Sequence, residues 1–431
     1  MNRMSRALAA GVSVGVILLL SFSSKAEAQQ PATPASAQPA SPPAAQPAQP
    51  AAQPAAPAST LKITPYGILY FNLFHDSGGS NNGDVPLWST AGPGSTSASA
   101  RQSRLGVRVT GLTAGTAKLS GVLEADFFGG FPAVGIGDNM GVLRLRLAHA
   151  RLDWKKTSVV VGQDWMIFAP ANPTSLASAG IPLMAASGNP WARLPQARVD
   201  YRVGSILLQG GVLAPSTGDF SAAFFYQPPS GALSEIPFFQ GRAAWSSANA
   251  LGEKRPASVG VSGHYGRSRV ITSTFDREVD SRGVAVDWSL AFAPRLTLTG
   301  EAFAGRNLGG FQAGVFQGIN PDAALGTGTA AIDDGPRAVE TRGGWTQLSV
   351  AVHPAVSVQA TYGLDDPKDE TLVSITRRDW RRRNLAYSFG FIHKLSPHFS
   401  WSVEDRQIVT HLALTGRHTT NHVNFATTFS F

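Results

Sequence analysis

The 431-residue sequence contains no cysteine, and charged residues make up only 15% of it. The missing thiols exclude disulfide frameworks, thiolate metal sites and cysteine nucleophiles. No basic arm or RNA-binding signature appears despite a pI near 9.9, which argues against a nucleic-acid partner. The histidines lack metal-ligand spacing, and no Ser/His/Asp catalytic set can be assembled from the sequence. We therefore expect no metal, no cofactor and no enzymatic activity.

The sequence also lacks an apolar run long enough to cross a bilayer as a helix. Its most apolar stretch, residues 7–20, is shorter than the roughly 20 residues that a spanning helix needs. Arg3 and Arg6 precede this stretch, and an A-x-A cleavage site follows it at 26–28. We interpret residues 1–28 as a cleaved secretory signal peptide, the alternative being a membrane anchor. Cleavage removes three cations and one anion, which lowers the net charge from +8 to +6.

Residues 29–60 contain only glutamine, proline, alanine, threonine and serine, and therefore carry no charged side chain. Such a composition cannot bury a core, so we expect a disordered periplasmic segment with polyproline character. Two roles remain open for it: a tether that binds peptidoglycan, or a passive spacer.

From residue 61 to residue 431 the sequence predicts an all-β fold, a transmembrane antiparallel β-barrel. In the last strand Val423, Phe425 and Phe429 alternate with His422 and Asn424, and repeated alternation of this kind is typical of barrel strands. Very short and long Gly/Pro-rich connections also alternate along the chain. We count sixteen strands, at 64–74, 101–110, 118–128, 142–154, 158–167, 196–203, 206–214, 238–246, 257–266, 282–292, 296–305, 343–353, 355–363, 384–394, 399–408 and 421–431.

Arginines alternate with aliphatic residues in several of these strands. Arg104 and Arg108 alternate with leucine and valine, and Arg144 and Arg146 alternate with leucines. A soluble sandwich would bury these charges at high cost, whereas a wide barrel keeps them hydrated in its lumen. The alternation slips by one residue near 148–149, which predicts a β-bulge there.

Three features resemble the trimeric outer-membrane porins of Gram-negative bacteria, in particular DcaP-like (dicarboxylate) porins. Arg101, Gln102, Ser103, Arg104, Leu105 and Gly106 resemble their second-strand Q-S-R-L-G motif. Val161, Gly162, Gln163, Asp164 and Trp165 resemble the segment before their constriction loop, and Phe431 matches their terminal residue. The resemblance implies a homotrimer in the bacterial outer membrane, with the third outer loop folded into the lumen.

Residues 168–195 occupy the position of that constriction loop. The segment contains five prolines but no aspartate or glutamate. Its candidate channel-facing residues are Pro170, Asn172, Ser175, Ser178, Asn189 and Arg193.

The predicted lumen face carries both basic and acidic residues. Its arginines are Arg104, Arg108, Arg144, Arg146, Arg151, Arg198, Arg202 and Arg242, and its main carboxylates are Glu124, Asp126, Asp153 and Asp200. Arginine rings select anions, so we expect anion preference. If the arginines pair with the carboxylates, they instead create a field across the pore.

The sequence therefore predicts a passive diffusion channel for small hydrophilic, mainly anionic solutes. The alternatives are a structural or adhesive barrel tethered to the cell wall and, with less support, a barrel enzyme. The arginine-rich run at 377–383 either binds lipopolysaccharide phosphates or attracts anions to the channel mouth, or it is a solvated surface. The acidic run at 365–370 is either a divalent-cation site or a solvated loop.

Overall fold

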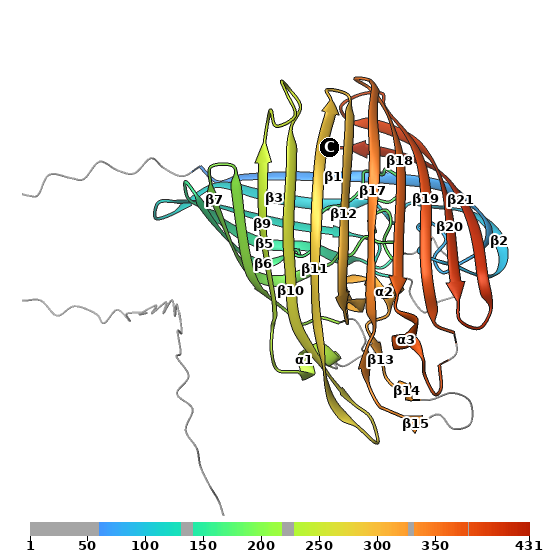
Figure 1. Cartoon of the computed structure of the whole chain (residues 1–431). Helices are drawn as coiled ribbons and strands as arrows, with labels where there is room; N and C mark the ends of the chain where they lie inside the picture. Colours follow the sequence, from blue (N-terminus) through green and yellow to red (C-terminus); the bar gives the residue numbers. More distant parts are fainter. Residues whose placement is uncertain (1–59, 131–140, 218–227, 326–331, 378) are drawn as a thin grey trace, which may run out of the picture. The chain divides into compact units, whose positions relative to one another are not determined.

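The computed structural model describes residues 60–130, 141–217, 228–325, 332–377 and 379–431. The expected signal peptide and all but the last residue of the segment at 29–60 lie outside this part of the chain. Sixteen strands form a closed antiparallel barrel (Figure 1), which confirms the predicted fold. They are β1 (Lys62–Ser80), β3 (Arg104–Ala114), β4 (Ala117–Asp126), β5 (Arg144–Asp153), β6 (Thr157–Trp165), β7 (Arg193–Val203), β8 (Ile206–Leu213), β9 (Phe238–Ser247), β10 (Ala257–Ile271), β11 (Asp276–Ala293), β12 (Leu296–Arg306), β17 (Glu340–His353), β18 (Val356–Pro367), β19 (Arg381–Lys394), β20 (Phe399–Leu412) and β21 (Gly416–Ser430).

The first strand closes the barrel. Its first half pairs with β3 and its second half with β21. At the junction the amide of Gly67 donates to the carbonyl of Phe431 at 3.1 Å, and the amide of Phe431 donates to the carbonyl of Gly67 at 3.2 Å. Closure gives each of the sixteen barrel strands a hydrogen-bonded neighbour on both sides, which protects these strands from edge-to-edge aggregation.

The outer connections contain the remaining elements. Strand β2 (Ser89–Ser99) pairs with the outer half of β1, within the stretch that the sequence predicted to be a plain loop. The others are short: α1 (Ser230–Leu233), α2 (Ala313–Phe316), α3 (Asp369–Leu372), a 3-10 turn at Gly309–Phe311, β13 (Ile319–Asn320), β14 (Ala324–Leu325), β15 (Ile332–Asp333) and β16 (Arg337–Ala338). No helix within the described ranges is long and apolar enough to cross a membrane.

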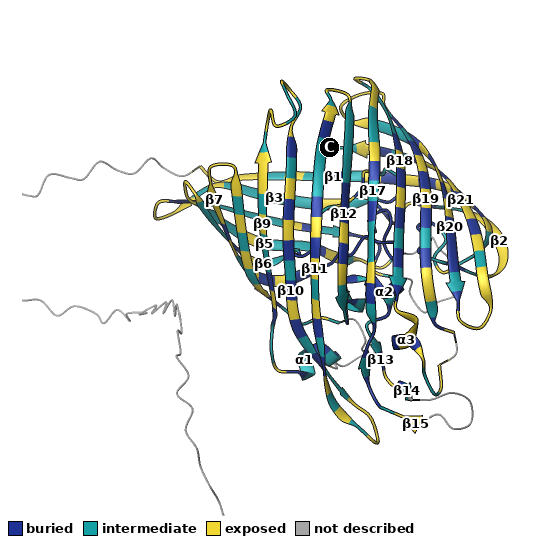
Figure 2. Ribbon diagram, in the orientation of Figure 1, coloured by how far each residue is buried: buried dark blue, intermediate teal, exposed yellow. Residues whose placement is uncertain are grey.

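The two faces of each strand differ in exposure, as β1 illustrates (Figure 2). Leu69, Phe71 and Leu73 are about half exposed, whereas Tyr70 and Asn72 are at most 3% exposed. The Tyr70 hydroxyl donates to the carbonyl of Ala177 inside the barrel at 3.0 Å. The buried face therefore points to the lumen and the apolar face points outward. This outward face suits the hydrocarbon of a bilayer.

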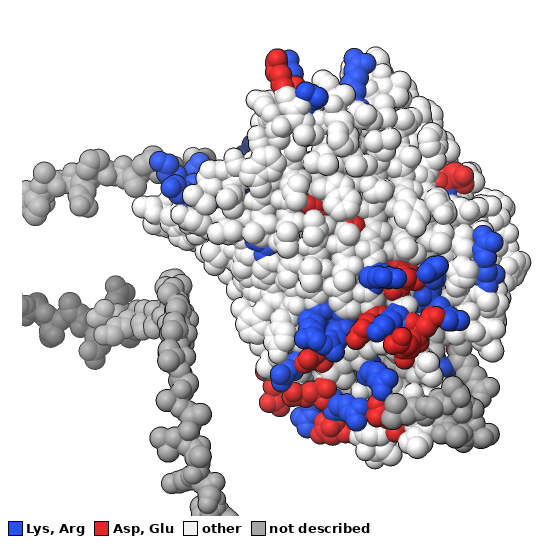
Figure 3. Space-filling view, in the orientation of Figure 1, with Lys and Arg blue, Asp and Glu red and all other residues white. Residues whose placement is uncertain are grey.

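Charged side chains gather at the loop-bearing end of the barrel, and the view in Figure 3 shows a mostly uncharged band above them. The opposite end has tight connections such as those between β7 and β8 and between β11 and β12. This asymmetry matches that of outer-membrane barrels, which have short periplasmic turns and long outer loops.

The predicted bulge is present, but it lies at Arg146 and not at 148–149. Glu124 pairs with Leu147 and Ala125 with Leu145, so Arg146 is the extra residue on β5. The Gln163 side chain donates to the carbonyls of Leu145 and Arg146 at 3.0 and 3.1 Å. These hydrogen bonds satisfy carbonyl groups at the bulge. The alternation of side chains alone does not show which residue of the strand is the extra one.

Candidate functional site

The connection between β6 and β7, residues 166–192, folds into the lumen. Its backbone is held by polar side chains from several strands of the wall. The Gln240 side chain accepts hydrogen bonds from the amides of Ile167 and Phe168 at 2.9 and 3.0 Å. Farther along, Glu301 accepts from Ala171 at 3.0 Å, and Gln347 accepts from Thr174 at 2.8 Å. The predicted constriction loop is therefore present, and it crosses the lumen between strands distant in sequence.

The Q-S-R-L-G motif at 102–106 forms hydrogen bonds with the middle of this loop. The fully buried Gln102 donates to the carbonyl of Ala177 at 3.2 Å and accepts from the amide of Gly180 at 2.7 Å. Arg104 donates to the carbonyl of Ala179 at 2.9 Å. The residues that carry the sequence resemblance thus bind backbone groups of the constriction loop.

The far end of the loop lies directly on the wall at β17 and β18. Gly188 has a φ of +100°, and a Cβ atom there would lie 2.1 Å from the carbonyl oxygen of Gly344 and 2.5 Å from that of Leu364. Only glycine accepts both this dihedral angle and this approach. Gly188 therefore fixes how closely the loop backbone packs on the barrel.

Asn384 connects two outer loops to the wall. Its buried amide donates to the carbonyls of Leu87 and Ala186 and to the hydroxyl of Ser187, and its oxygen accepts from Thr410 at 2.6 Å.

Leaving several buried groups unpaired costs about 1–3 kcal/mol for each group. We expect Asn384→Ala to lower the resistance of the folded barrel to heat or urea. The measurement is the temperature or urea concentration at which the gel mobility changes from that of the folded barrel to that of the unfolded chain. Asn421→Ala, at an exposed position, is the control and should leave that resistance unchanged.

The six predicted loop residues differ in their exposure and in the element to which they belong. Pro170 and Asn172 are exposed in the lumen, and Ser175 is half-buried and donates to Glu404 at 2.5 Å. Ser178 and Asn189 are buried in the loop. The assignment of the sixth residue to the loop was wrong, because Arg193 begins β7 and pairs with Trp165 of β6. The loop ends at residue 192 because β7 starts three residues earlier than predicted.

Three predicted arginines share two carboxylates where the loop approaches β3–β5. Arg146 is buried and donates to both Glu124 and Asp126 at 2.7 Å. Arg144 donates to Asp126 at 2.7 Å, and Arg104 lies 3.6 Å from Glu124. These arginines are paired, and they outnumber the carboxylates that they contact.

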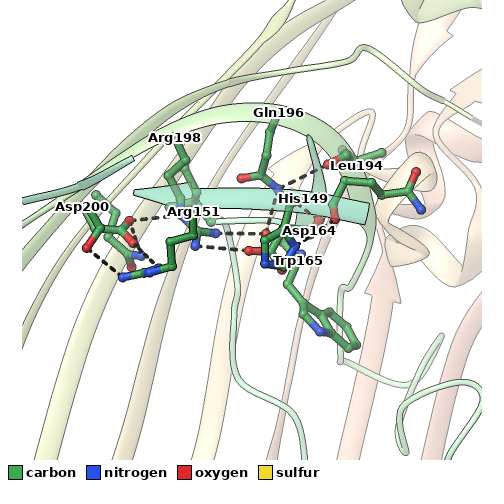
Figure 4. Close-up of polar contacts among 12 residues, drawn as sticks. His149, Arg151, Asp164, Trp165, Leu194, Gln196, Arg198 and Asp200 are labelled. Carbon is green, nitrogen blue, oxygen red and sulfur yellow. Dashed lines mark hydrogen bonds and ion pairs between the residues drawn. The ribbon is translucent and has the colours of Figure 1, made fainter. Parts of the chain in front are cut away.

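A second network continues along β5–β7 (Figure 4). Arg198 contacts Asp164 at 3.2 Å and Asp200 at 3.0 Å. Arg151 contacts Asp200 at 3.4 Å and Asp153 at 2.8 Å. In this network the positive and negative charges alternate in space, so it creates a local field with no surplus of positive charge.

The other predicted arginines differ in their partners. Arg242 pairs with Asp287 at 2.6 Å. Arg108 and Arg202 are exposed, and the described residues place no carboxylate within salt-bridge distance of either. The Arg108 guanidinium instead lies over the Tyr66 ring, 5.0 Å from its centroid. Most of the predicted arginine ladder is thus paired with carboxylates, and only part of it retains unopposed charge.

Arg193 is the cation that the sequence assigned to the wrong element. Its guanidinium lies 4.2 Å from the ring centroid of Trp165 and 5.1 Å from that of Trp191. Its Nε has no hydrogen-bond partner within the described ranges, and it interacts electrostatically with Arg146 and Arg144. Cation–π contacts with two indoles stabilise this charge without neutralising it. The sequence signal for these contacts was a tryptophan near each end of the loop, Trp165 just before it and Trp191 two residues before Arg193.

The acidic run at 365–370 does not converge on a common point. Asp365 faces inward and accepts from Thr341 at 2.6 Å, whereas Asp366 pairs with Arg383 at 2.8 Å. The hydrogen bond from Arg382 to Asp369 lowers the pKa of that carboxyl. Among the described residues no group of three histidine, aspartate or glutamate side chains gathers as a metal site would require. Asp366 and Asp369 therefore neutralise part of the charge of the arginine-rich run at 377–383.

The comparisons with known proteins give a match in structure only. No family model and no curated protein sequence matches this chain. The outer-membrane channel DcaP of Acinetobacter baumannii superposes with a TM-score of 0.66 at 16% identity, covering 87% of this chain and 98% of its own. The anion-selective porin from Comamonas acidovorans gives 0.55 at 16% identity, covering 86% and 100%, and Pseudomonas putida OprB gives 0.53 at 11% identity, covering 85% and 94%. This chain has the closed sixteen-strand barrel fold of the outer-membrane porins.

Proposed function

We propose that this protein is a passive diffusion channel in the bacterial outer membrane, that it admits small hydrophilic solutes and that it prefers anions. The barrel supports this proposal because its outward face is apolar and its lumen face is polar. The constriction loop supports it because the loop occupies the lumen and leaves Pro170 and Asn172 exposed there. Solutes are sorted by size at this narrowing, with no chemical step.

The proposed anion preference depends on the excess of arginine beside the loop. Among the described residues, Arg104, Arg144, Arg146 and Arg193 lie around only two carboxylates, Glu124 and Asp126. A narrow passage with low-dielectric walls concentrates the field of unpaired charge and raises the local concentration of counter-ions. Planar guanidinium forks suit carboxylate and phosphate groups alike, so the proposal extends to both classes of anion.

A planar-bilayer recording in a salt gradient tests the proposed function. We expect the wild-type protein to form stable pores whose reversal potential has the sign of anion permeation. A cation-selective reversal potential would contradict the charge argument while leaving the channel proposal intact. Absence of conductance from correctly folded barrels would contradict both.

We propose three partners for this channel. Two more copies of the chain would complete a homotrimer, which light scattering in detergent tests. Outer-membrane lipid and lipopolysaccharide would contact the outward face, where Arg342 is 79% exposed at the loop-bearing end. Peptidoglycan would bind residues 29–60, and a pull-down with and without that segment tests this contact.

A further inference from the structure

A second outer connection also folds inward, between β12 and β17. In its first part, residues 308–317, Phe311, Ala313 and Val315 are at most 1% exposed. The carbonyl of Phe311 accepts a hydrogen bond from the amide of Trp191 at 3.0 Å. Phe311 and Phe168 of the constriction loop belong to one apolar cluster. This segment therefore packs on the constriction loop and not on the exterior of the barrel.

The backbone of the segment is strained. Gln312, Val315 and Phe316 have φ angles of +66°, +50° and +62°. A left-handed conformation costs an L-residue roughly 1–2 kcal/mol, and it is an outlier for β-branched valine. A segment that only connected two strands would relax into an unstrained path, so contacts with the rest of the barrel must hold this shape.

Two strands supply those contacts around Val315. Asp365 of β18, 1% exposed, accepts from the amide of Val315 at 3.0 Å. Arg381 of β19 donates from Nε to the carbonyl of Val315 at 2.7 Å. The Gln317 side chain donates to the carbonyls of Gly314 and Arg381 at 2.9 and 2.8 Å. The strained turn is thus held against the inner wall on both sides.

The same turn contacts the first outer loop, residues 81–88 between β1 and β2. Val315 belongs to an apolar cluster with Val85 and Leu87. The ring of Phe316 lies 5.5 Å from that of Trp88, over which the Arg381 guanidinium is centred at 4.4 Å. Three connections therefore converge inside the loop-bearing end of the barrel: the first outer loop, the constriction loop and residues 308–317.

We propose that residues 308–317 form a second filter in the channel, which we name the outer filter, and that Asp365 holds it in place. The inference rests on the proposed channel function but does not depend on anion preference. The outer filter limits solute size at the mouth, and the arginines beside the constriction loop select charge. The outer filter also gives a physical reason for the strained backbone, because Asp365 and Arg381 hold the turn inside the lumen, where it narrows the path of the solute.

Asp365→Leu tests this proposal, since leucine has a similar volume but accepts no hydrogen bond. The amide of Val315 and the hydroxyl of Thr341 then lose their acceptor, and the turn should leave the lumen. We expect a roughly twofold rise in single-channel conductance, since pore dimensions govern permeation, and faster entry of large neutral sugars into proteoliposomes. The ion selectivity should not change. Asp366→Leu is the matched control, because the neighbouring Asp366 pairs with Arg383 and does not contact the turn.

A second variant keeps the proposal testable if Asp365→Leu fails to fold. Replacing residues 309–316 with a Gly-Ser linker of equal length removes the filter and leaves the wall residues intact. The heat-modifiable gel mobility of each variant identifies folded barrels. Unchanged conductance and sugar entry in the folded linker variant would overturn the outer filter. Absence of wild-type conductance would instead contradict the proposed function.

Discussion

Replacing Arg193 with glutamine should lower the ratio of anion to cation permeability by roughly tenfold, because a narrow pore focuses the field of a single unpaired charge. Arg193 is the clearest position for this test. Its guanidinium lies on Trp165 and Trp191, and its Nε has no hydrogen-bond partner among the described residues. Removing this charge therefore leaves no carboxylate without a partner. The reversal potential in a salt gradient measures the effect.

Two further variants define what the Arg193→Gln result means. Arg269→Gln is the control, because Arg269 is exposed and pairs with Asp276 at 2.6 Å; it should leave the reversal potential unchanged. Joint replacement of Arg144 and Arg146 by glutamine should shift selectivity toward cations as well. That double variant also leaves the buried Asp126 unpaired, so its stability must be measured alongside. An unchanged reversal potential in folded Arg193→Gln protein would show that Arg193 does not set the anion preference of the pore.

Gly188→Ala should release the far end of the constriction loop and raise single-channel conductance, with larger sugars entering proteoliposomes. The added Cβ would lie 2.1 Å from the carbonyl oxygen of Gly344, a backbone atom that no rotamer change can move. The φ of +100° adds strain for any residue with a side chain. The loop then has to withdraw from β17 and β18, or the barrel has to open around it.

Gly115→Ala is the control that separates the effect of the steric clash at Gly188 from the effect of backbone strain. Gly115 also has a positive φ, of +59°, but a Cβ there would meet nothing within 4 Å. This control should keep wild-type conductance at a stability cost of about 1 kcal/mol. Equal conductance of the two folded variants would show that the contact at Gly188 does not hold the loop in the lumen.

Much of the wall could be predicted from the sequence because the alternation of side chains is local. In β21, Val423 and Phe425 are about 40% exposed, whereas His422 and Asn424 are fully buried, as their alternation indicated. The number of strands followed from the same signal combined with the turn residues. The bulge was predicted two residues away from Arg146, because several positions for an extra residue fit the same pattern of exposed leucines.

The sequence by itself determined the strands and their two faces, because these depend on the chemistry of neighbouring residues, whereas the entry of the third outer loop into the lumen was expected only from the resemblance to porins. Only the tertiary structure decided which charges cancel. Arg146 meets Glu124 and Asp126 of another strand, whereas Arg193 meets two indoles. Only the tertiary structure revealed that residues 308–317 also turn inward, because Asp365, which holds them, lies some fifty positions farther along the chain. Such contacts depend on strand register and loop path, which local sequence patterns do not encode.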